Sequence, residues 1–257
     1  LDLAAALRPD ELLGPKLAIV NPPLWELGHV AWFQERWALR QALRRAPLRG
    51  DADALYDSIA IPHDARWSLP LPPLDATAGY LREAGAAVED ALGELRPEDR
   101  YYVELSVLHE DMHAEAMAFS RQTLGWAAPA LSASAGGGVR GAGPAGGAPR
   151  AEGDVRVPGG TLLLGSGAGE PFTFDNERRA HEVELGSFAI ARTPVTQAEF
   201  AAFVDEGGYA RRELWSAEGW AWRSALDARA PVHWRREGRA WVRRDFDRWV
   251  ALEPRRP

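Results

Sequence analysis

The chain contains no cysteine among its 257 residues. This excludes a disulfide scaffold, a thiolate nucleophile and any Cys-ligated zinc or iron–sulfur site, and it fits a reducing compartment such as the cytoplasm. No apolar run approaches the roughly 20 residues that a membrane-spanning helix requires, so we expect no integral membrane protein. The first residue is leucine rather than methionine, which leaves room for an upstream segment, a targeting peptide included.

The residues that are present indicate a globular protein. Hydrophobic residues make up 46% of the chain and charged residues 26%, and the length allows one large domain or two ordinary ones. The segment from Arg211 to the end contains twelve arginines, seven acidic residues and several of the eleven tryptophans. Such a segment could bind single-stranded nucleic acid. We favour arginines stacked on tryptophans at a packed surface, and we expect no nucleic-acid partner.

A stretch rich in glycine, alanine and proline divides the chain at residues 132–152. It has almost nothing to bury, so its ordering entropy would go uncompensated, and it is typical of a flexible linker. We therefore predict one domain at residues 1–131 and a second at 153–257.

The region before the linker is predicted to be helical, because its apolar residues recur at helical spacing. Four segments carry this pattern: part of 2–18, then 22–39, 75–95 and 97–124. Asp75 is a candidate N-cap and Gly125 a stop signal, while residues 50–73 form a long connecting loop. Four helices indicate a bundle.

The region after the linker indicates an α+β domain. Residues 155–165 resemble a strand pair with a turn, and residues 181–190 alternate as one strand. Thr196 and Glu199 have the spacing of a capping box for a short helix that ends near Val204. The remainder is predicted to be tight loops held by tryptophans.

Three histidines are the strongest candidates for chemistry. His109 and His113 lie four residues apart in a predicted helix, so both rings leave the same face and can bind one metal ion. His29 lies in the first predicted helix, and a bundle can bring it to that pair. Gly28 beside it would permit close backbone approach. Spacing alone leaves open that these are packed or solvated histidines.

The other histidines are interpreted as structural. His63, His181 and His233 fall in predicted loops or at strand ends.

The segment from His109 to His113 also matches the H-E-x-x-H pattern of zinc peptidases, in which the glutamate, here Glu110, is the general base. That function needs a third ligand downstream and a second lobe. Glu115 is too close for the usual arrangement, and the linker then follows. A zinc metallopeptidase is kept as an alternative.

Three histidines without a carboxylate leave several coordination positions open. On zinc this set suits hydrolysis or hydration, and on iron(II) it leaves room for a thiolate, O2 and a co-substrate. Spacing does not choose between the metals.

Several motifs occur together along nearly the whole chain. They are Pro23-Leu24-Trp25-Glu26-Leu27-Gly28-His29, Trp32-Phe33-Gln34-Glu35, His109 to His113, Phe174-Asp175-Asn176-Glu177 with His181, Pro194-Val195-Thr196, Glu199-Phe200, Gly207-Gly208-Tyr209, and Trp215-Ser216 with Gly219-Trp220. In this order they resemble the EgtB-type ergothioneine synthases, which are nonheme iron sulfoxide synthases. The resemblance implies a DinB-like four-helix bundle followed by a formylglycine-generating-enzyme-like, C-type-lectin-related α+β domain.

The resemblance also implies a site and a reaction. His29, His109 and His113 correspond to the family's Fe(II) ligands. The implied enzyme is an iron-dependent oxidoreductase that uses O2 to couple a thiol or selenosugar donor to C2 of the imidazole of hercynine, whose trimethylammonium suits an aromatic pocket.

Two departures from the family pattern concern the substrates. Met112 stands where the family commonly has a glutamine that holds the substrate imidazole. Trp25-Glu26-Leu27-Gly28-His29 replaces the more usual Trp-His-Leu-Ala-His. Both departures favour the selenoneine-synthase branch, in which a C–Se bond forms, without deciding between sulfur and selenium.

A third departure concerns length. The chain stops at Pro257, where the family continues with the second half of the sulfatase-modifying-factor-like fold, including a catalytic tyrosine. We therefore expect a fragment that holds the metal ligands, lacks part of the active site and exposes core aromatic residues. A non-catalytic DinB-like metal-binding module is the remaining alternative. The sequence does not indicate an oligomeric state.

Overall fold

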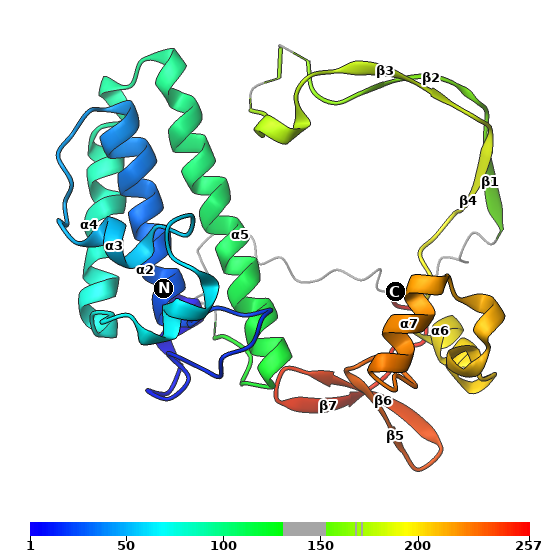
Figure 1. The fold of residues 1–257 in the computed structure, drawn as a ribbon. Helices are drawn as coiled ribbons and strands as arrows, with labels where there is room; N and C mark the ends of the chain where they lie inside the picture. Colours follow the sequence, from blue (N-terminus) through cyan, green and yellow to red (C-terminus); the bar gives the residue numbers. More distant parts are fainter. Residues whose placement is uncertain (131–152, 168, 171) are drawn as a thin grey trace. The chain divides into compact units, whose positions relative to one another are not determined.

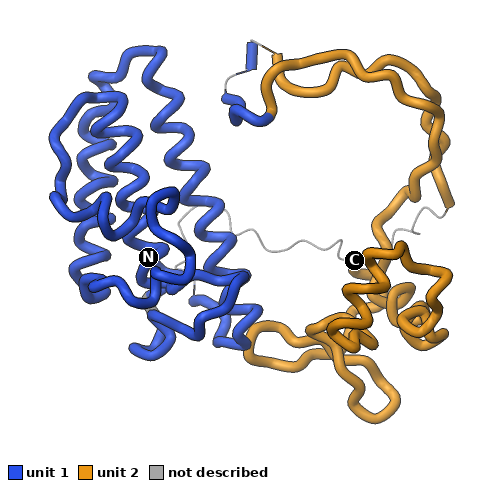
Figure 2. Tube along the Cα trace, viewed as in Figure 1, with its two compact units in different colours: residues 1–132, 168–176 blue, residues 133–167, 177–257 orange. Residues whose placement is uncertain are grey.

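The computed structural model describes residues 1–130, 153–167, 169–170 and 172–257. Two compact units divide the chain, one of residues 1–132 with 168–176 and one of residues 133–167 with 177–257 (Figure 2). The predicted linker, residues 132–152, lies outside the described residues. Among the helices that the structure describes, none offers an apolar stretch long enough to cross a bilayer.

The first unit is helical, as predicted (Figure 1). Its helices are α1 (Asp2–Ala5), α2 (Pro23–Gln34), the π-helical η1 (Glu35–Ala42), α3 (Ala52–Tyr56), α4 (Leu74–Asp90) and α5 (Arg100–Leu124), with 3₁₀ turns η2 (His63–Ser68), η3 (Leu92–Glu94) and η4 (Pro97–Asp99). The predicted helix at 22–39 is thus α2 continued by η1. The predicted helix at 97–124 begins as the turn η4 and ends at Gly125, which adopts the left-handed conformation.

The partial helix predicted within residues 2–18 is confirmed, and it covers Asp2–Ala5. It does not continue, because Pro9 has no amide hydrogen to donate and Gly14 adopts a positive φ of 61°. Two other details of the helical prediction were wrong. Helix α4 begins right after the extended Pro73, so Asp75 lies inside the first turn and is not the cap. The segment 50–73, predicted as a plain loop, contains α3 and η2.

Helix α2 lies at the centre of this unit and is buried on all sides. Residues 23–32 are all buried, and the helix contacts α3, α4 and α5. A helix surrounded in this way belongs to the core rather than to a surface stripe. The core cluster comprises Ala4, Trp25, Leu27, Val30, Ala31, Trp32, Ala52, Leu55, Tyr56, Tyr80, Leu81 and Met117.

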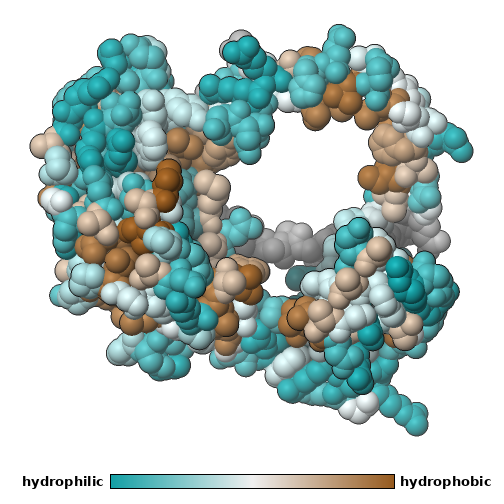
Figure 3. Space-filling view, viewed as in Figure 1, coloured by the Kyte–Doolittle hydropathy of each residue, from teal (hydrophilic) through white to brown (hydrophobic). Residues whose placement is uncertain are grey.

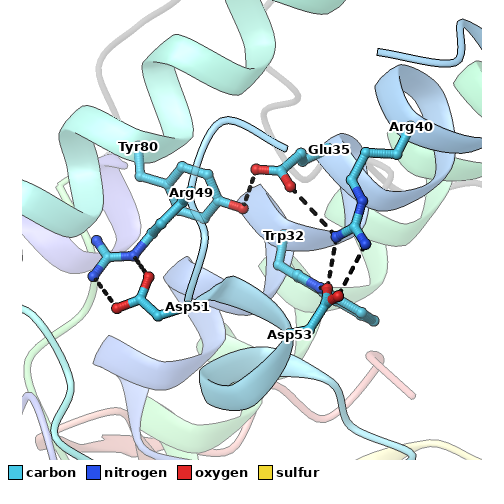
Figure 4. A network of polar contacts seen from close by, with 7 residues as sticks. All are labelled: Trp32, Glu35, Arg40, Arg49, Asp51, Asp53 and Tyr80. Carbon is cyan, nitrogen blue, oxygen red and sulfur yellow. Dashed lines mark hydrogen bonds and ion pairs between the residues drawn. The ribbon is translucent and has the colours of Figure 1, made fainter. Parts of the chain in front are cut away.

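A polar network, buried at Tyr80 and Glu35 and exposed at Asp53, joins the elements around α2 (Figure 4). The Tyr80 hydroxyl of α4 donates to the fully buried carboxylate of Glu35 at 2.8 Å, and burial together with this carboxylate raises the pKa of Tyr80. Arg40 of η1 lies 3.5 Å from Glu35 and donates to both oxygens of Asp53 in α3. Trp32 also donates to Asp53, at 2.7 Å. The network therefore fixes α3 and α4 against the continuous helix α2–η1. A separate pair, Arg49 with Asp51, closes the turn before α3.

The second unit mixes strands and helices, as predicted. Its elements are the antiparallel pairs β1 (Asp154–Val157) with β4 (Phe188–Ala191) and β2 (Gly160–Leu164) with β3 (His181–Leu185), helices α6 (Gln197–Asp205) and α7 (Ala217–Ala225), turns η6 (Gly208–Ala210) and η7 (Arg212–Leu214), and the antiparallel sheet β5 (Trp234–Glu237), β6 (Ala240–Asp245) and β7 (Arg248–Ala251). The turn η5 (Asp175–Glu177) lies at the division between the units.

The strand pairing differs from the sequence prediction. The two strands within 155–165 do not pair with each other, because β1 pairs with β4 and β2 with β3. The single strand expected at 181–190 is broken at Gly186–Ser187 into β3 and β4. A Cβ atom on Gly159 would lie 2.8 Å from the carbonyl oxygen of Leu185, so this glycine permits the close approach where the two ribbons meet.

The predicted capping box is confirmed. The amide of Glu199 donates to the Thr196 hydroxyl at 3.3 Å, and the Glu199 carboxylate accepts from the Thr196 amide at 2.8 Å. The remainder is more regular than the predicted loops, because it contains α7 and the sheet β5–β6–β7. Arginines stack on tryptophans there, as we favoured. The pairs are Arg212 and Arg223 with Trp220, Arg235 with Trp249, and Arg236 with Trp241.

Apolar side chains of the second unit's strands are exposed. Leu163 of β2 is 64% exposed and Ile190 of β4 57%, and the aromatic residues Phe188 and Trp222 are exposed as well. Figure 3 shows hydrophobic residues on the surface of both ribbons. The expectation of exposed aromatic residues therefore agrees with the structure.

Candidate metal centre

Helix α2 presents three ring N–H donors to the segment around α3. Trp25 donates to the carbonyl oxygen of Leu55 at 2.8 Å, His29 Nδ1 lies 2.8 Å from that of Tyr56, and Trp32 donates to Asp53. Positions i, i+4 and i+7 lie on one helix face, so one stripe of α2 holds this whole segment. A carbonyl oxygen can only accept, so Nδ1 of His29 carries the hydrogen. The Nε2 atom of the neutral ring therefore keeps a free lone pair.

Gly28 allows the close packing that this arrangement needs. A Cβ atom at this position would lie 2.2 Å from the ring of Tyr56. A close approach beside His29 is therefore present, and it is the Tyr56 side chain of α3 that packs against the Gly28 backbone.

The structure brings the three predicted histidines together. His109 and His113 are one turn apart on α5, with ring centroids separated by 4.5 Å, and they lie 5.0 Å and 4.9 Å from the ring of His29. One nitrogen from each ring can be chosen so that all three lie within 4.8 Å of one another. Phe33 stacks on His109 at 3.6 Å, and Trp25 stacks on His29 at 4.7 Å. The rings are thus held by packing as well as by the helices.

The electrostatics keep two of these imidazoles uncharged. Burial lowers the pKa of His29 to about 4, against the opposing effect of its bond to Tyr56. Burial, with the other two histidines, lowers the pKa of His109 to about 2. Both rings are neutral at pH 7, which is the form that binds metals.

Unpartnered ring nitrogens also fit a metal ion. Within the described part of the chain, no group lies within hydrogen-bond distance of the buried Nδ1 atoms of His109 and His113. Buried polar atoms normally have a partner, so these rings are not committed to other hydrogen bonds and each can still offer a nitrogen to a divalent ion.

The remaining predicted residues lie outside this cluster. Met112 is 47% exposed, although it directly precedes His113. Glu110, the glutamate of H-E-x-x-H, is exposed and accepts from Nε2 of Gln34 at 2.7 Å. The three histidines interpreted as structural contact other groups: His63 the carbonyl of Val20, His181 the carbonyl of Arg179, and His233 the side chain of Arg244.

Comparison with known proteins gives a family for this chain. Residues 142–246 match the model of the sulfatase-modifying factor enzyme 1-like domain. The hercynine oxygenase of Mycolicibacterium smegmatis is 37% identical over 225 residues, which cover 86% of this chain and 51% of that protein. The hercynine oxygenase of Mycobacterium tuberculosis is 35% identical over 230 residues, covering 88% and 52%. The chain belongs to the EgtB-type ergothioneine synthase family.

A shorter similarity extends beyond this family. The formylglycine-generating enzyme of Streptomyces coelicolor is 43% identical over 67 residues, which cover 26% of this chain and 21% of that enzyme. The chain spans about half the length of the hercynine oxygenases that it matches.

Sequence reasoning missed the groups that surround the histidines. Glu26 is 2% exposed and its Oε1 lies 3.7 Å from Nδ1 of His113. It precedes His29 by three residues, so helical spacing alone could have placed it on the same face. The contact between His29 and the carbonyl oxygen of Tyr56 could not be predicted in this way, because every residue has a backbone carbonyl and no side-chain pattern marks this one.

Proposed function

We propose that His29, His109 and His113 bind an Fe(II) ion, and that this chain belongs to an oxidoreductase that joins a sulfur or selenium donor to hercynine. The observation that carries the proposal is the convergence of three imidazoles from two helices at one point. The membership in a family with hercynine oxygenases supports the substrate.

The protein's own residues would hold the histidines for this task. The Tyr56 carbonyl fixes the tautomer of His29, and Phe33 fixes the plane of the His109 ring. The ion would supply coordination positions for O2 and for the donor atom. In the reaction with a thiol, the C2 hydrogen of hercynine and the S–H hydrogen end in one water molecule. The second oxygen atom of O2 becomes the sulfoxide oxygen.

The domain organisation belongs to the same proposal. We propose a DinB-like bundle at residues 1–131, a linker at 132–152, and the first part of a sulfatase-modifying-factor-like domain at 153–257. The helical first unit and the match at residues 142–246 support the order of the two domains. Met112 is proposed to contact the substrate imidazole from α5. Together with Glu26 and Gly28, it favours a selenium donor. A cytoplasmic location remains a prediction.

The zinc-peptidase alternative gains no support from the geometry. A general base must reach a water molecule on the metal, but Glu110 is exposed and hydrogen bonded to Gln34. We therefore do not propose proteolysis.

Anaerobic titration with Fe(II) tests the metal site. We expect the chain to bind one Fe(II), and His29→Ala, His109→Ala and His113→Ala each to abolish binding, because two imidazoles alone hold the ion poorly. The matched control is His63→Ala, since this ring bonds to the Val20 carbonyl outside the cluster. Unchanged iron stoichiometry in His113→Ala would contradict the proposal.

The substrate is tested separately. Hercynine added to the iron-loaded chain should perturb the spectrum of the metal, whereas a purely structural metal-binding module would show no change. The donor is then identified by product analysis of the complete gene product supplied with hercynine and O2. γ-Glutamylcysteine, cysteine or a selenosugar is added in parallel reactions.

A further inference from the structure

A chain of polar contacts leads away from the histidine cluster on the side of His113. Oε1 of Glu26 lies 3.7 Å from Nδ1 of His113, just beyond hydrogen-bond distance, and the same oxygen accepts from Nδ2 of Asn21 at 3.0 Å. The Oδ1 atom of Asn21 in turn accepts from the guanidinium of Arg66 at 2.7 Å. Because Arg66 can only donate, it fixes the orientation of the Asn21 amide, which then presents its NH2 group to Glu26.

The contacts also lead from Arg66 to His29 on helix α2. The guanidinium of Arg66 lies 4.0 Å from the ring centre of Trp25, and Trp25 stacks on His29 with an angle of 10° between the rings. Polar groups therefore lead from His113 to Arg66, and aromatic contacts lead from Arg66 to His29.

Glu26 is an unusual residue for this place. It is 2% exposed on a helix that is buried on all sides, and a carboxylate is costly to bury without partners. Asn21 provides one hydrogen bond, and the charge of Arg66 lies one residue further along the chain of contacts. Glu26 is not part of the group whose nitrogens converge, so it is placed to act on a ligand and not as one.

We propose that Glu26 is a positioning residue: when the metal is bound, Glu26 closes on His113, accepts its Nδ1 hydrogen and thereby directs Nε2 of that ring to the metal. The inference rests on the proposed metal site and specifies how one of its ligands is held. A carboxylate behind a metal-bound histidine fixes its tautomer and raises its basicity, and the loss of such a partner typically lowers metal affinity.

Metal affinity in variants provides the first test. Cobalt(II), which gives visible d–d bands, is titrated into the full chain. Glu26→Ala should weaken binding by about ten- to a hundredfold and shift the bands. Glu26→Gln keeps an acceptor oxygen and should lie between that variant and the wild type. Asn21→Ala leaves the carboxylate but frees it, so a smaller loss is expected.

A matched control is available on the neighbouring helix. Glu110→Gln removes a carboxylate from the residue next to His109, and this carboxylate bonds to Gln34 instead of an imidazole. It should leave the cobalt affinity and spectrum unchanged. Circular dichroism confirms that each variant is folded.

A second measurement needs no substitution. In the zinc-loaded wild-type protein, long-range ¹H–¹⁵N correlation spectra show which nitrogen of His113 carries the hydrogen. We expect a hydrogen on Nδ1 and the metal on Nε2. The metal on Nδ1 would overturn the inference, even if Glu26→Ala fails to fold.

The outcomes separate the inference from the proposed function. If the wild-type chain binds no metal, or if His113→Ala binds as well as the wild type, the metal site itself is wrong. If His113→Ala loses the metal while Glu26→Ala matches the wild type in affinity and spectrum, the site stands and the role of Glu26 is overturned.

Discussion

Single side chains of α2 serve the core and the candidate metal centre at once. His29 is 3% exposed, stacks on Trp25 and donates to the carbonyl of Tyr56. Its ring is therefore held by the same packing that stabilises the helical unit. A change in the packing against Tyr56 should disturb both the stability of the unit and the position of His29.

Gly28→Ala tests this coupling. The new Cβ would lie 2.2 Å from the Tyr56 ring, so α3 must shift and the acceptor of His29 shifts with it. We expect the free energy of unfolding to fall by about 1–3 kcal/mol, as in other overpacked cores, and the Fe(II) affinity to fall as well. Urea unfolding and metal titration measure the two effects.

Gly79→Ala is the matched control, since a Cβ at Gly79 in α4 meets no atom within 4 Å. It should raise stability by up to about 1 kcal/mol through helix propensity alone. If both variants behave alike, Gly28 has no special role.

The elements of the helical unit could largely be predicted from the sequence, and the strand pairing could not. Apolar spacing located α2, α4 and α5, because helical periodicity is a local property of the chain. The partner of β1 is β4, which follows β2 and β3 in the sequence, and no local pattern specifies such a contact. The candidate site shows the same division. His109 and His113 share one helix and were readable, whereas the Tyr56 carbonyl comes from a segment that was predicted as a loop.

The attachment of α3 should depend on pH. Hydrogen bonds from Arg40 and Trp32 lower the pKa of Asp53 to about 2, below the value of about 3.9 for an unfolded chain. A lowered pKa in the folded state gives stability that is present above about pH 4 and is lost as the pH falls towards 2. Asp53→Asn should therefore be less stable than the wild type at pH 7, with a difference that closes between about pH 4 and pH 2.

Urea midpoints over this pH range measure the difference. Glu83→Gln, at an exposed position of α4, is the control and should follow the wild type throughout. If the difference in urea midpoint between Asp53→Asn and the wild type stays constant down to pH 2, the ionised form of Asp53 does not contribute to stability.

At the scale of the whole molecule, the two units differ in how well they bury their apolar residues. The helical unit encloses Trp25, Tyr56 and Leu39 almost completely, whereas Leu163 and Ile190 of the second unit are more than half exposed. Contiguous exposed apolar surface promotes association. We therefore attribute any self-association of this chain to the β1–β4 and β2–β3 ribbons.

Leu163→Lys tests this assignment. Leu163 lies opposite Glu182 in the β2–β3 pair, so a lysine there gains a cross-strand partner of opposite charge. We expect sedimentation velocity to show less self-association than in the wild type, with the free energy of unfolding unchanged within about 0.5 kcal/mol. Val242→Lys, at a buried position of β6, should instead destabilise the protein. If Leu163→Lys self-associates as strongly as the wild type, the surface that causes self-association lies elsewhere.

Because Trp25 stacks on His29, its fluorescence should report whether a metal ion is bound at the candidate centre. An indole 4.7 Å from a ring that binds an open-shell ion loses its fluorescence, while a closed-shell ion such as zinc leaves it bright. With eleven tryptophans in the chain, the dimming would be a small fraction of the total emission. Replacing Trp25 with phenylalanine would remove that fraction and identify its source, so occupancy can be followed in solution without any added dye.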